Sequence, residues 1–532
     1  MSRSDEPTVG DLAVGSFTDQ GPWVIDPAAL TWRRDIAPLR AQARGRVPKW
    51  LVRRRVPPIG RVLRVVARIG TALAIWAVRA RGREGSRRDL SHRLRIAFGH
   101  LGPTYIKLGQ IVSGGEGLFP PELVDEFKLL RDRVPAEPFT EVRRVVEAEL
   151  GRPLEEVFAE FDREPIAAAS IAQVHGARLR SGEPVVVKVQ RPGIAELVRS
   201  DIAALSWLAP FLVGRIPVAA LANPPALIEL FAETIVEELD FRLEADSMLD
   251  VAAVLAETGE RSTVVPRPHP ELVTRRVLVM ERLDGIPWDD VASMHAAGVD
   301  TEAVLHASLV AFMEGAMVFG VFHGDLHGGN LMVRPDGRIV VMDFGITGRL
   351  DEAQRLAFLM LLVAGTTGNT MGQLAALRDL GAFPPDTDLR QVFTDLQLDR
   401  TMDPTAMSAD ELVHELQDLT KKLLGYGARA PKELMLFVKN LMFLDGTIAR
   451  FAPDLDIIGE IEKVHLEIAE RHGARFAAEL GLDALGPLDI EAVKAAMGVP
   501  DVERLTYRDV QERRDTVRRR LEERRGGPPS GS

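Results

Sequence analysis

Two short motifs in the second half of the chain constrain its fold more than any other feature. The first is HGDLHGGN, which runs from His323 to Asn330, and the second is Asp-Phe-Gly, which begins at Asp343, 13 residues after Asn330. The segment between them, LMVRPDGRIVVMD, predicts a β-hairpin that turns at Pro-Asp-Gly. Because the two strands of a hairpin lie side by side, we expect Asn330 and Asp343 to lie close together.

The residue types in these motifs suit phosphoryl transfer. That reaction needs groups that hold magnesium on the phosphates and a group that orients the attacking hydroxyl or water. We expect Asp325 to orient the nucleophile or accept its proton, and Asn330 and Asp343 to bind the metal. The order of these residues resembles the catalytic loop and Asp-Phe-Gly motif of protein kinases. This resemblance implies ATP or ADP and Mg²⁺ as cofactors.

A kinase also needs a lysine on a buried strand that reaches the α- and β-phosphates, and a helix carboxylate that holds it in place. Residues 171–190 predict a β-hairpin, and Lys188 lies in its apolar second strand, VVVKV, where an unpaired ammonium would be costly. The helix that contains EELDFRLEA is expected to supply the carboxylate. Spacing alone leaves four candidates open: Glu237, Glu238, Asp240 and Glu244.

The segment before Lys188 has alanines where a kinase phosphate loop has glycines. Its sequence is PIAAASIAQVH, from Pro165 to His175. Alanine rarely adopts a positive φ, so this loop is not expected to wrap phosphates as a glycine loop does. Its backbone N–H groups are still expected to contact the nucleotide, and the residues concerned are Ala167, Ala168, Ala169 and Ser170.

This alanine loop resembles that of the UbiB (AarF-type) family of atypical kinases. Two further motifs agree with the resemblance, which covers roughly residues 101–350: KLGQ at 107–110 matches the family's Lys-x-Gly-Gln motif, and ELD at 238–240 matches its Glu-x-Asp motif. The family implies that Glu244 is the partner of Lys188. It also implies an extension that folds over the active site and hinders protein substrates, with Lys107 and Gln110 contacting Glu238 and Asp240.

Three further segments bear on the predicted site. The segment SGGEGLFP at 113–120 stands where the family commonly has a Ser-Thr-Arg-Pro-Asp-like sequence, which puts in doubt how firmly the extension gates the site. The adenine is expected near MERLDG at 280–285, beside the backbone of Glu281 and Leu283. After Asp-Phe-Gly the chain is expected to enter a helix directly, without an Ala-Pro-Glu signature or a long activation segment.

Charge is distributed unevenly along the chain, whose formal net charge is −11. Residues 33–95 contain 19 Lys or Arg and 3 Asp or Glu, together with the apolar run IGTALAIWAV at 69–78. That run is about half the length needed to span a bilayer. A basic helix of this kind is typical of an anionic membrane surface, and a helix packed on the main domain is the alternative. No nucleic-acid motif accompanies the charge, so nucleic acid is not an expected partner.

The whole chain predicts an α+β, bilobal, protein-kinase-like fold with a small β-rich lobe, a helical second lobe and a helical N-terminal extension. We expect one continuous helix over 223–256, and mostly helix from 286 to about 475 apart from the strands between 330 and 344. The expected divisions are a flexible lead-in (1–48), a basic helical segment (49–100), the KLGQ extension (101–164), the small lobe (165–285), the helical lobe (286–480) and a charged tail (481–532).

The leading hypothesis is an ATPase or kinase of the UbiB type that supports isoprenoid quinone or lipid metabolism. Two alternatives remain open: a small-molecule phosphotransferase of the aminoglycoside or choline type, and a nucleotide-gated lipid-binding scaffold. Expected partners are a nucleotide, an anionic membrane surface or isoprenoid lipid, and a second copy of the chain. The first residues do not resemble a signal peptide, and we expect a cytoplasmic location with peripheral attachment to the inner face of the membrane.

Overall fold

The computed structural model divides the chain into two compact units. Unit 1 comprises residues 1–250, 266–283 and 343–346, and unit 2 comprises residues 251–265, 284–342 and 347–532. The residues that the structure describes are 17, 21–23, 25–52, 58–79, 86–113, 120–130, 135–212, 224–259, 262–398, 418, 422–423, 425–428, 431–482, 488–496 and 505–523. Most of the lead-in before residue 21, the SGGEGLFP segment between 114 and 119, and the tail after 523 lie outside these residues.

A six-stranded antiparallel sheet forms the centre of unit 1. Its strand order is β1-β3-β4-β7-β6, and β2 pairs with β3. The predicted hairpin at 171–190 is confirmed as β3 and β4. The bounds are β1 Phe158–Phe161, β2 Ala167–Ala168, β3 Ala172–Leu179, β4 Pro184–Gln190, β6 Pro268–Val273 and β7 Val277–Glu281.

Alternation along β4 decides which of its side chains are buried in the core. Val185, Val187 and Val189 point into a core that they share with α8 (Phe139–Leu150), α9 (Leu154–Val157) and strand β7. Successive side chains of a strand point to opposite faces, so Lys188 lies on the other face.

The helix predicted over 223–256 is instead two helices, α11 (Pro224–Glu238) and α12 (Phe241–Thr258). The break lies at Asp240, whose side chain accepts a hydrogen bond from the backbone N–H of Arg242. The N–H of Phe241 donates to the carbonyl of Arg275 at 3.0 Å instead of to its own helix. An aspartate that competes for backbone N–H groups in this way favours a helix start over a helix interior.

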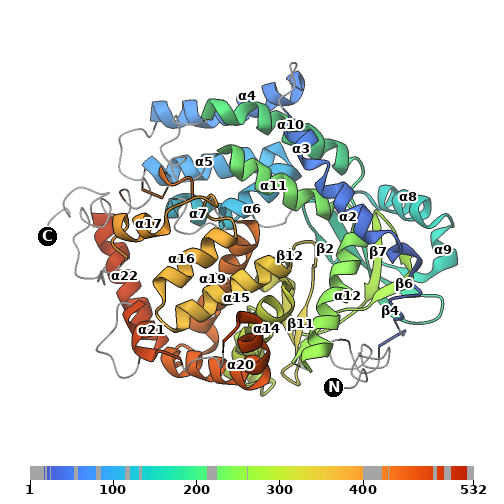
Figure 1. Cartoon of the computed structure of the whole chain (residues 1–532). Helices are drawn as coiled ribbons and strands as arrows, with labels where there is room; N and C mark the ends of the chain where they lie inside the picture. Colours follow the sequence, from blue (N-terminus) through green and yellow to red (C-terminus); the bar gives the residue numbers. More distant parts are fainter. Residues whose placement is uncertain are drawn as a thin grey trace. The chain divides into compact units, whose positions relative to one another are not determined.

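The remaining helices of unit 1 come from the N-terminal half of the chain (Figure 1). Helix α10 contacts α3, α4, α6 and α11, and α5 contacts α4, α6 and α7. Their bounds are η1 Thr31–Arg33, α2 Ile36–Arg44, α3 Val47–Leu51, α4 Ile59–Arg79, α5 Ser86–Leu101, α6 Pro103–Ser113, α7 Pro121–Lys128 and α10 Ile194–Leu212.

Unit 2 is mainly helical and contains two small sheets. One has the order β5-β11-β10-β8, in which β10 and β11 form the hairpin predicted through Pro-Asp-Gly, and the other pairs β9 with β12. Strand β12 lies where a helix was expected to follow Asp-Phe-Gly directly, so that expectation is wrong for residues 347–349. The strands are β5 Thr263–Val264, β8 Ile286–Pro287, β9 Val321–His323, β10 Leu331–Val333, β11 Ile339–Val341 and β12 Thr347–Arg349.

Side-chain caps begin several helices of unit 2. The carboxylate of Asp300 accepts two backbone N–H groups at the start of α14, and Asp351 with Gln354 forms a capping box at α15. The helices are α13 Val291–Ala296, α14 Thr301–Glu314, the π-helical turn η3 Gly315–Phe319, the 3₁₀ turn η4 Gly328–Asn330, α15 Glu352–Thr366, α16 Thr370–Asp379, α17 Leu389–Asp395, α19 Lys432–Phe451, α20 Ile457–Leu480, α21 Ile490–Ala496 and α22 Tyr507–Glu523.

One stretch of the described residues, Thr301–Phe319, is long and apolar enough to span a membrane by length and composition, and half of it is buried inside the protein. Its Glu314 is buried and pairs with His472 at 2.8 Å and with Arg471 at 3.2 Å, both on α20. These contacts identify the stretch as a core helix of unit 2.

The α+β kinase-like fold class expected from the sequence is confirmed.

Candidate functional site

The predicted site residue Lys188 lies on strand β4 of unit 1. Its ammonium lies 2.6 Å from Oε1 of Glu244 and 3.1 Å from Oδ1 of Asp343. The side chain of Lys188 is 12% exposed and that of Glu244 is 3% exposed, whereas that of Asp343 is 46% exposed. The lysine also lies over the ring of Phe241. Strand β4, helix α12 and the Asp-Phe-Gly segment thus bring one cation and two carboxylates together.

The charges around Lys188 keep it protonated. Burial alone would lower the pKa of an ammonium, but the carboxylates of Asp343 and Glu244 outweigh burial and raise the pKa of Lys188 above its ordinary value. A cation held in this way remains available to bind an anionic ligand at neutral pH.

The geometry separates the four carboxylates that spacing could not. Glu244 contacts Lys188, and each of the other three pairs with a different cation: Glu237 with Arg44 at 2.8 Å, Glu238 with Lys107 at 3.1 Å, and Asp240 with Arg242 at 2.7 Å. Lys107 lies on α6, and Gln110 lies one turn further along the same helix. The structure therefore brings Lys107 to the Glu-x-Asp segment.

The alanine loop forms a tight extension of the sheet. Ala167 and Ala168 pair with Val174 and Gln173 as strand β2, and the N–H of Ala169 donates to the carbonyl of Ala172 at 2.8 Å. The guanidinium of Arg191 donates to the carbonyl of Ala169 at 3.0 Å. Ser170 follows and is buried. The loop is consequently a pinned hairpin whose backbone conformations suit alanine.

Glu281 and Leu283 lie at the end of strand β7. Glu281 is buried, its N–H donates to the carbonyl of Arg267 at 2.8 Å, and its carboxylate accepts the N–H of Arg267 at 3.2 Å. Leu283 is half-buried and is the last residue of unit 1 in this part of the chain.

The catalytic-loop motif of unit 2 is held by its own histidine. Nδ1 of His323 accepts the N–H of Asp325 at 3.2 Å, and Nε2 lies 3.2 Å from the carbonyl of Met342. Both bonds form together when the proton is on Nε2. The side-chain amide of Asn330 donates to the carbonyl of Asp325 at 3.1 Å, which closes the loop.

Two residues of α19 complete this loop, and the sequence reasoning missed both. The ammonium of Lys439 forms an ion pair with the carboxylate of Asp325. Asn440 is fully buried, and its side chain accepts the N–H of Leu326 at 2.9 Å and donates to the carbonyl of His323. The signal was a Lys-Asn pair inside the apolar run LMLFVKNLMF, where a polar side chain that faces the core needs a partner.

Asp343 has an unusual backbone conformation. Its φ of +57° lies in the left-handed region, which aspartate and asparagine tolerate better than most residues. The preceding residue, Met342, donates its N–H to the carbonyl of Asn330 at 2.9 Å. Oδ1 of Asp343 also accepts the N–H of Gly345 at 3.3 Å. The half-exposed carboxylate of Asp343 is thus held by a backbone N–H of its own turn.

The residue types fit a magnesium ion that is shared with phosphates. Magnesium is usually held by one or two protein carboxylates or amides together with substrate oxygens and water. Asp343 supplies a half-exposed carboxylate, and Asn330 has its side-chain oxygen left over after its amide nitrogen has bonded Asp325. Within the described ranges, no group of three or more His, Cys, Asp or Glu residues could hold a metal alone.

The sequence is similar to one family model and to several bacterial and plant proteins. Residues 129–375 match the ABC1 atypical kinase-like domain. An uncharacterized protein of Mycobacterium tuberculosis is 37% identical over 390 residues, which cover 70% of this chain and 78% of that protein. An uncharacterized chloroplastic aarF domain-containing protein kinase of Arabidopsis thaliana is 34% identical over 391 residues, covering 69% and 72%. A probable protein kinase UbiB of Aeromonas hydrophila is 31% identical over 375 residues, covering 69% and 68%.

Proposed function

The chain belongs to the UbiB (aarF-type) family of atypical kinase-like proteins, and on that premise we propose that it binds ATP with magnesium and transfers or hydrolyses the terminal phosphate. One observation carries the proposal: Lys188, whose side chain is 12% exposed, lies between the carboxylates of Glu244 and Asp343. A structural ion pair needs only one carboxylate. The second, half-exposed carboxylate suits a ligand group that binds beside the lysine.

The predicted site residues would bind and position the nucleotide. Lys188, oriented by Glu244, neutralises α- and β-phosphate oxygens, and Asp343 with Asn330 holds magnesium. The metal supplies charge neutralisation on the phosphates when it is bound. The backbone at Glu281 and Leu283 would lie beside the adenine, and N–H groups of the alanine loop other than that of Ala169 would face the phosphates.

The loop of unit 2 would act on the attacking group. Asp325 orients the hydroxyl or water and takes its proton while the new bond to the γ-phosphorus forms and the bond to the bridging oxygen breaks, releasing ADP. Lys439 and the N–H of Asp325 itself, bonded to His323, fix the position of that carboxylate. The acceptor is water or a hydroxyl of a lipid or quinone precursor, as the family resemblance suggests.

Asp343→Asn tests this proposal because asparagine also tolerates a left-handed φ, so the fold is kept while one negative charge is lost. We expect magnesium-dependent phosphate release from ATP to disappear. Asp336→Asn is the matched control, since Asp336 has the same 46% side-chain exposure and lies in the hairpin turn. Normal magnesium-dependent turnover in Asp343→Asn, alongside an unchanged control, would refute the metal assignment.

The KLGQ segment is proposed to regulate access to this site. The ammonium of Lys107 forms an ion pair at 3.1 Å with the carboxylate of Glu238, the first residue of the Glu-x-Asp motif. That ion pair gives α6 a fixed position on α11. Lys107→Met would remove this ion pair between α6 and α11, and we propose that protein substrates then become phosphorylated.

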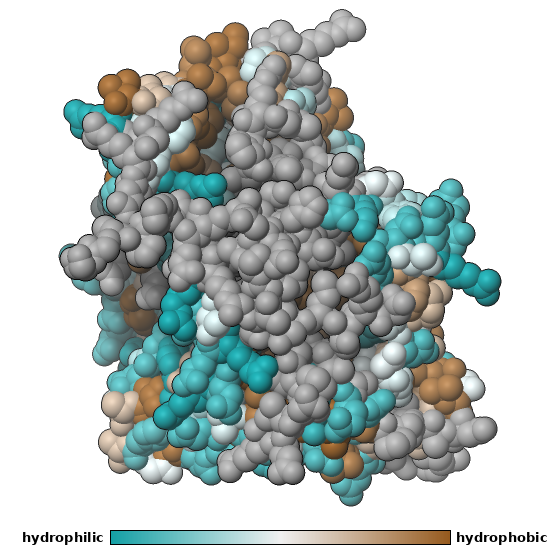
Figure 2. All heavy atoms as spheres, turned by 90° about the vertical axis from the view of Figure 1, so that its left-hand side faces the viewer, coloured by the Kyte–Doolittle hydropathy of each residue, from teal (hydrophilic) through white to brown (hydrophobic). Residues whose placement is uncertain are grey.

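We also propose that α4 attaches the protein to an anionic membrane surface. Large apolar side chains on this helix are exposed at a spacing that keeps most of them on one face, namely Ile59, Leu63, Val66, Leu73 and Val78. Figure 2 shows apolar side chains at its upper edge, the height at which Figure 1 draws α4. Arg64, Arg68 and Arg79 are exposed on the same helix, as in helices that lie in the lipid interface.

Flotation with vesicles tests the role of α4. Leu63→Glu places a charge in the exposed stripe, and Leu466→Glu on α20 is a control of nearly equal exposure, 62% against 60%. We expect the first variant alone to lose binding to vesicles that contain anionic lipid. Equal flotation of both variants would contradict the assignment of α4.

A further inference from the structure

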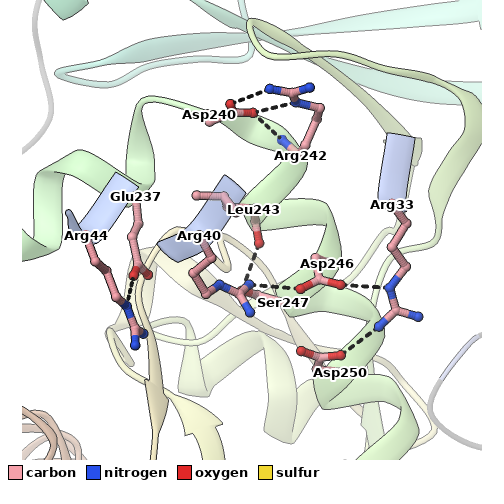
Figure 3. A network of polar contacts seen from close by, with 10 residues as sticks. All are labelled: Arg33, Arg40, Arg44, Glu237, Asp240, Arg242, Leu243, Asp246, Ser247 and Asp250. Carbon is pink, nitrogen blue, oxygen red and sulfur yellow. Dashed lines mark hydrogen bonds and ion pairs between the residues drawn. The ribbon is translucent and has the colours of Figure 1, made fainter. Parts of the chain in front are cut away.

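An N-terminal strap, residues 31–51, is tied to α11 and α12 by arginines. Arg33 contacts Asp246 at 2.7 Å and Asp250 at 2.9 Å, and Arg40 contacts the other oxygen of Asp246 at 2.9 Å. Arg44 pairs with a residue of α11 in the same way (Figure 3). Because Asp246 is buried and shared by two guanidiniums, the strap is a fixed wall of unit 1.

The strap encloses a pocket of about 470 Å³ with α10, α11 and α12. This volume lies within the range of pockets that hold drug-sized ligands, roughly 300–1,000 Å³. Its apolar wall is formed by side chains from each of these elements, namely Leu39, Ala43, Trp50, Ala195, Val236, Leu239 and Leu243. The pocket lies apart from Lys188, since none of the residues that contact that ammonium lines it.

Four cations line the same pocket: Arg46, Lys49, Arg199 and Arg275. All four are exposed, and among the residues that the structure describes no carboxylate lies within ion-pair distance of any of them. The single acidic residue of the lining is Asp240, and its carboxylate is held by both nitrogens of the Arg242 fork. The pocket thus has an excess of uncompensated positive charge beside an apolar wall.

We propose that this pocket binds an amphiphile with a phosphate or diphosphate head group. The head would lie among Lys49, Arg199 and Arg275, and the apolar part would lie along Leu39, Trp50 and the helix side chains. Charge-assisted contacts to phosphate oxygens are strong and directional for arginine. Apolar burial adds affinity in proportion to the area removed from water. Neither component of the lining alone would select such a ligand.

Calorimetric titration of the full chain with dodecyl phosphate, below its micelle concentration, tests the proposal. We expect binding with a 1:1 stoichiometry and a change in fluorescence from Trp50. Arg199→Ala should weaken the Kd about tenfold, the effect of losing one good phosphate contact. Arg34→Ala is the matched control, because Arg34 is an exposed arginine of the same strap that does not line the pocket. Equal affinity in the two variants would overturn the proposal.

Two further ligands test the contribution of the apolar wall and show whether the amphiphile comes from a membrane or from solution. Inorganic phosphate that bound as tightly as dodecyl phosphate would overturn the role of the apolar wall, and so would unchanged affinity in Leu39→Glu. Vesicles that contain phosphatidic acid distinguish a lipid presented by a membrane from a soluble monomer. If the protein binds the vesicles through Arg199 and does not bind dodecyl phosphate monomers, the ligand is a lipid presented by a membrane. If it binds the monomers and not the vesicles, the ligand is a soluble amphiphile. Absence of both would overturn the site.

Discussion

Replacing Lys188 by methionine should destabilise unit 1 in a way that depends on pH. The substitution keeps the aliphatic part of the side chain and removes the cation beside Glu244, whose side chain is 3% exposed. Glu244 must then stay charged without a partner or take up a proton. A carboxylate without a partner in such a place is costly, so protonation limits the loss.

The free energy needed to protonate Glu244 sets the expected loss of stability. The ordinary pKa of a glutamate is 4.5, and burial already raises the pKa of Glu244. At about 1.4 kcal/mol for each pH unit above 4.5, protonation at pH 7 costs about 3.5 kcal/mol, and at pH 5.5 about 1.4 kcal/mol. In the variant the pKa of Glu244 is higher in the folded than in the unfolded chain. The loss of stability therefore shrinks as pH falls toward 4.5 and grows as pH rises above it.

Urea unfolding followed by tryptophan fluorescence measures this loss. Five of the six tryptophans lie in unit 1, so the signal reports chiefly on that unit: Trp23, Trp32, Trp50, Trp76 and Trp207. The double variant Lys188→Met with Glu244→Gln is the control, because its neutral amide has no proton to gain and its deficit should not change between pH 5.5 and 7. A single-variant deficit that is equal at both pH values would refute the reasoning.

Three other outcomes follow from contacts within unit 2. Lys439→Met should lower ATP turnover about 100-fold by releasing the carboxylate of Asp325 from its position, and Lys439→Arg should restore part of it in a phosphate-release assay. His306→Asn should cost stability mainly at low pH. Burial lowers the pKa of His306, but its two glutamate partners outweigh burial and raise that pKa above its ordinary value. The stabilisation by these contacts is therefore complete below pH 6.5 and is lost as pH rises through the folded-state pKa. Thermal unfolding of the variant and the unmodified protein at pH 6 and pH 8.5 measures this difference. Gly348→Ala should lower the free energy of unfolding by at least about 1–3 kcal/mol, because an added Cβ would lie 2.3 Å from the buried ring of Phe322. Thermal unfolding measures this loss as well.

Local patterns predicted the strands that carry the motifs. The hairpins at 171–190 and around Pro-Asp-Gly are short-range structures whose alternation and turn residues lie in one stretch of sequence. The break between α11 and α12 was missed because apolar residues continue at helical spacing across it. A backbone bond from Phe241 to Arg275, 34 residues away, decides where the second helix begins.

The partners of the motif residues were harder to predict because they are distant in sequence. Lys439 contacts Asp325 across 114 residues, and Arg33 contacts Asp246 across 213. Each alone looks like an ordinary solvated cation on a helix. Spacing likewise left Glu237, Glu238, Asp240 and Glu244 equivalent, and only the positions of their cations distinguish them.

The lysine between two carboxylates determines which charge a polyphosphate would meet at this place. One positive and two negative charges give the trio of Lys188, Glu244 and Asp343 a net charge of −1. A bare polyphosphate approaching it meets repulsion from Asp343, whereas the same polyphosphate carrying a divalent cation presents that carboxylate with an attractive partner. If the site binds nucleotide as proposed, this charge would favour the chelated form over the unchelated form, and the preference should weaken as ionic strength rises.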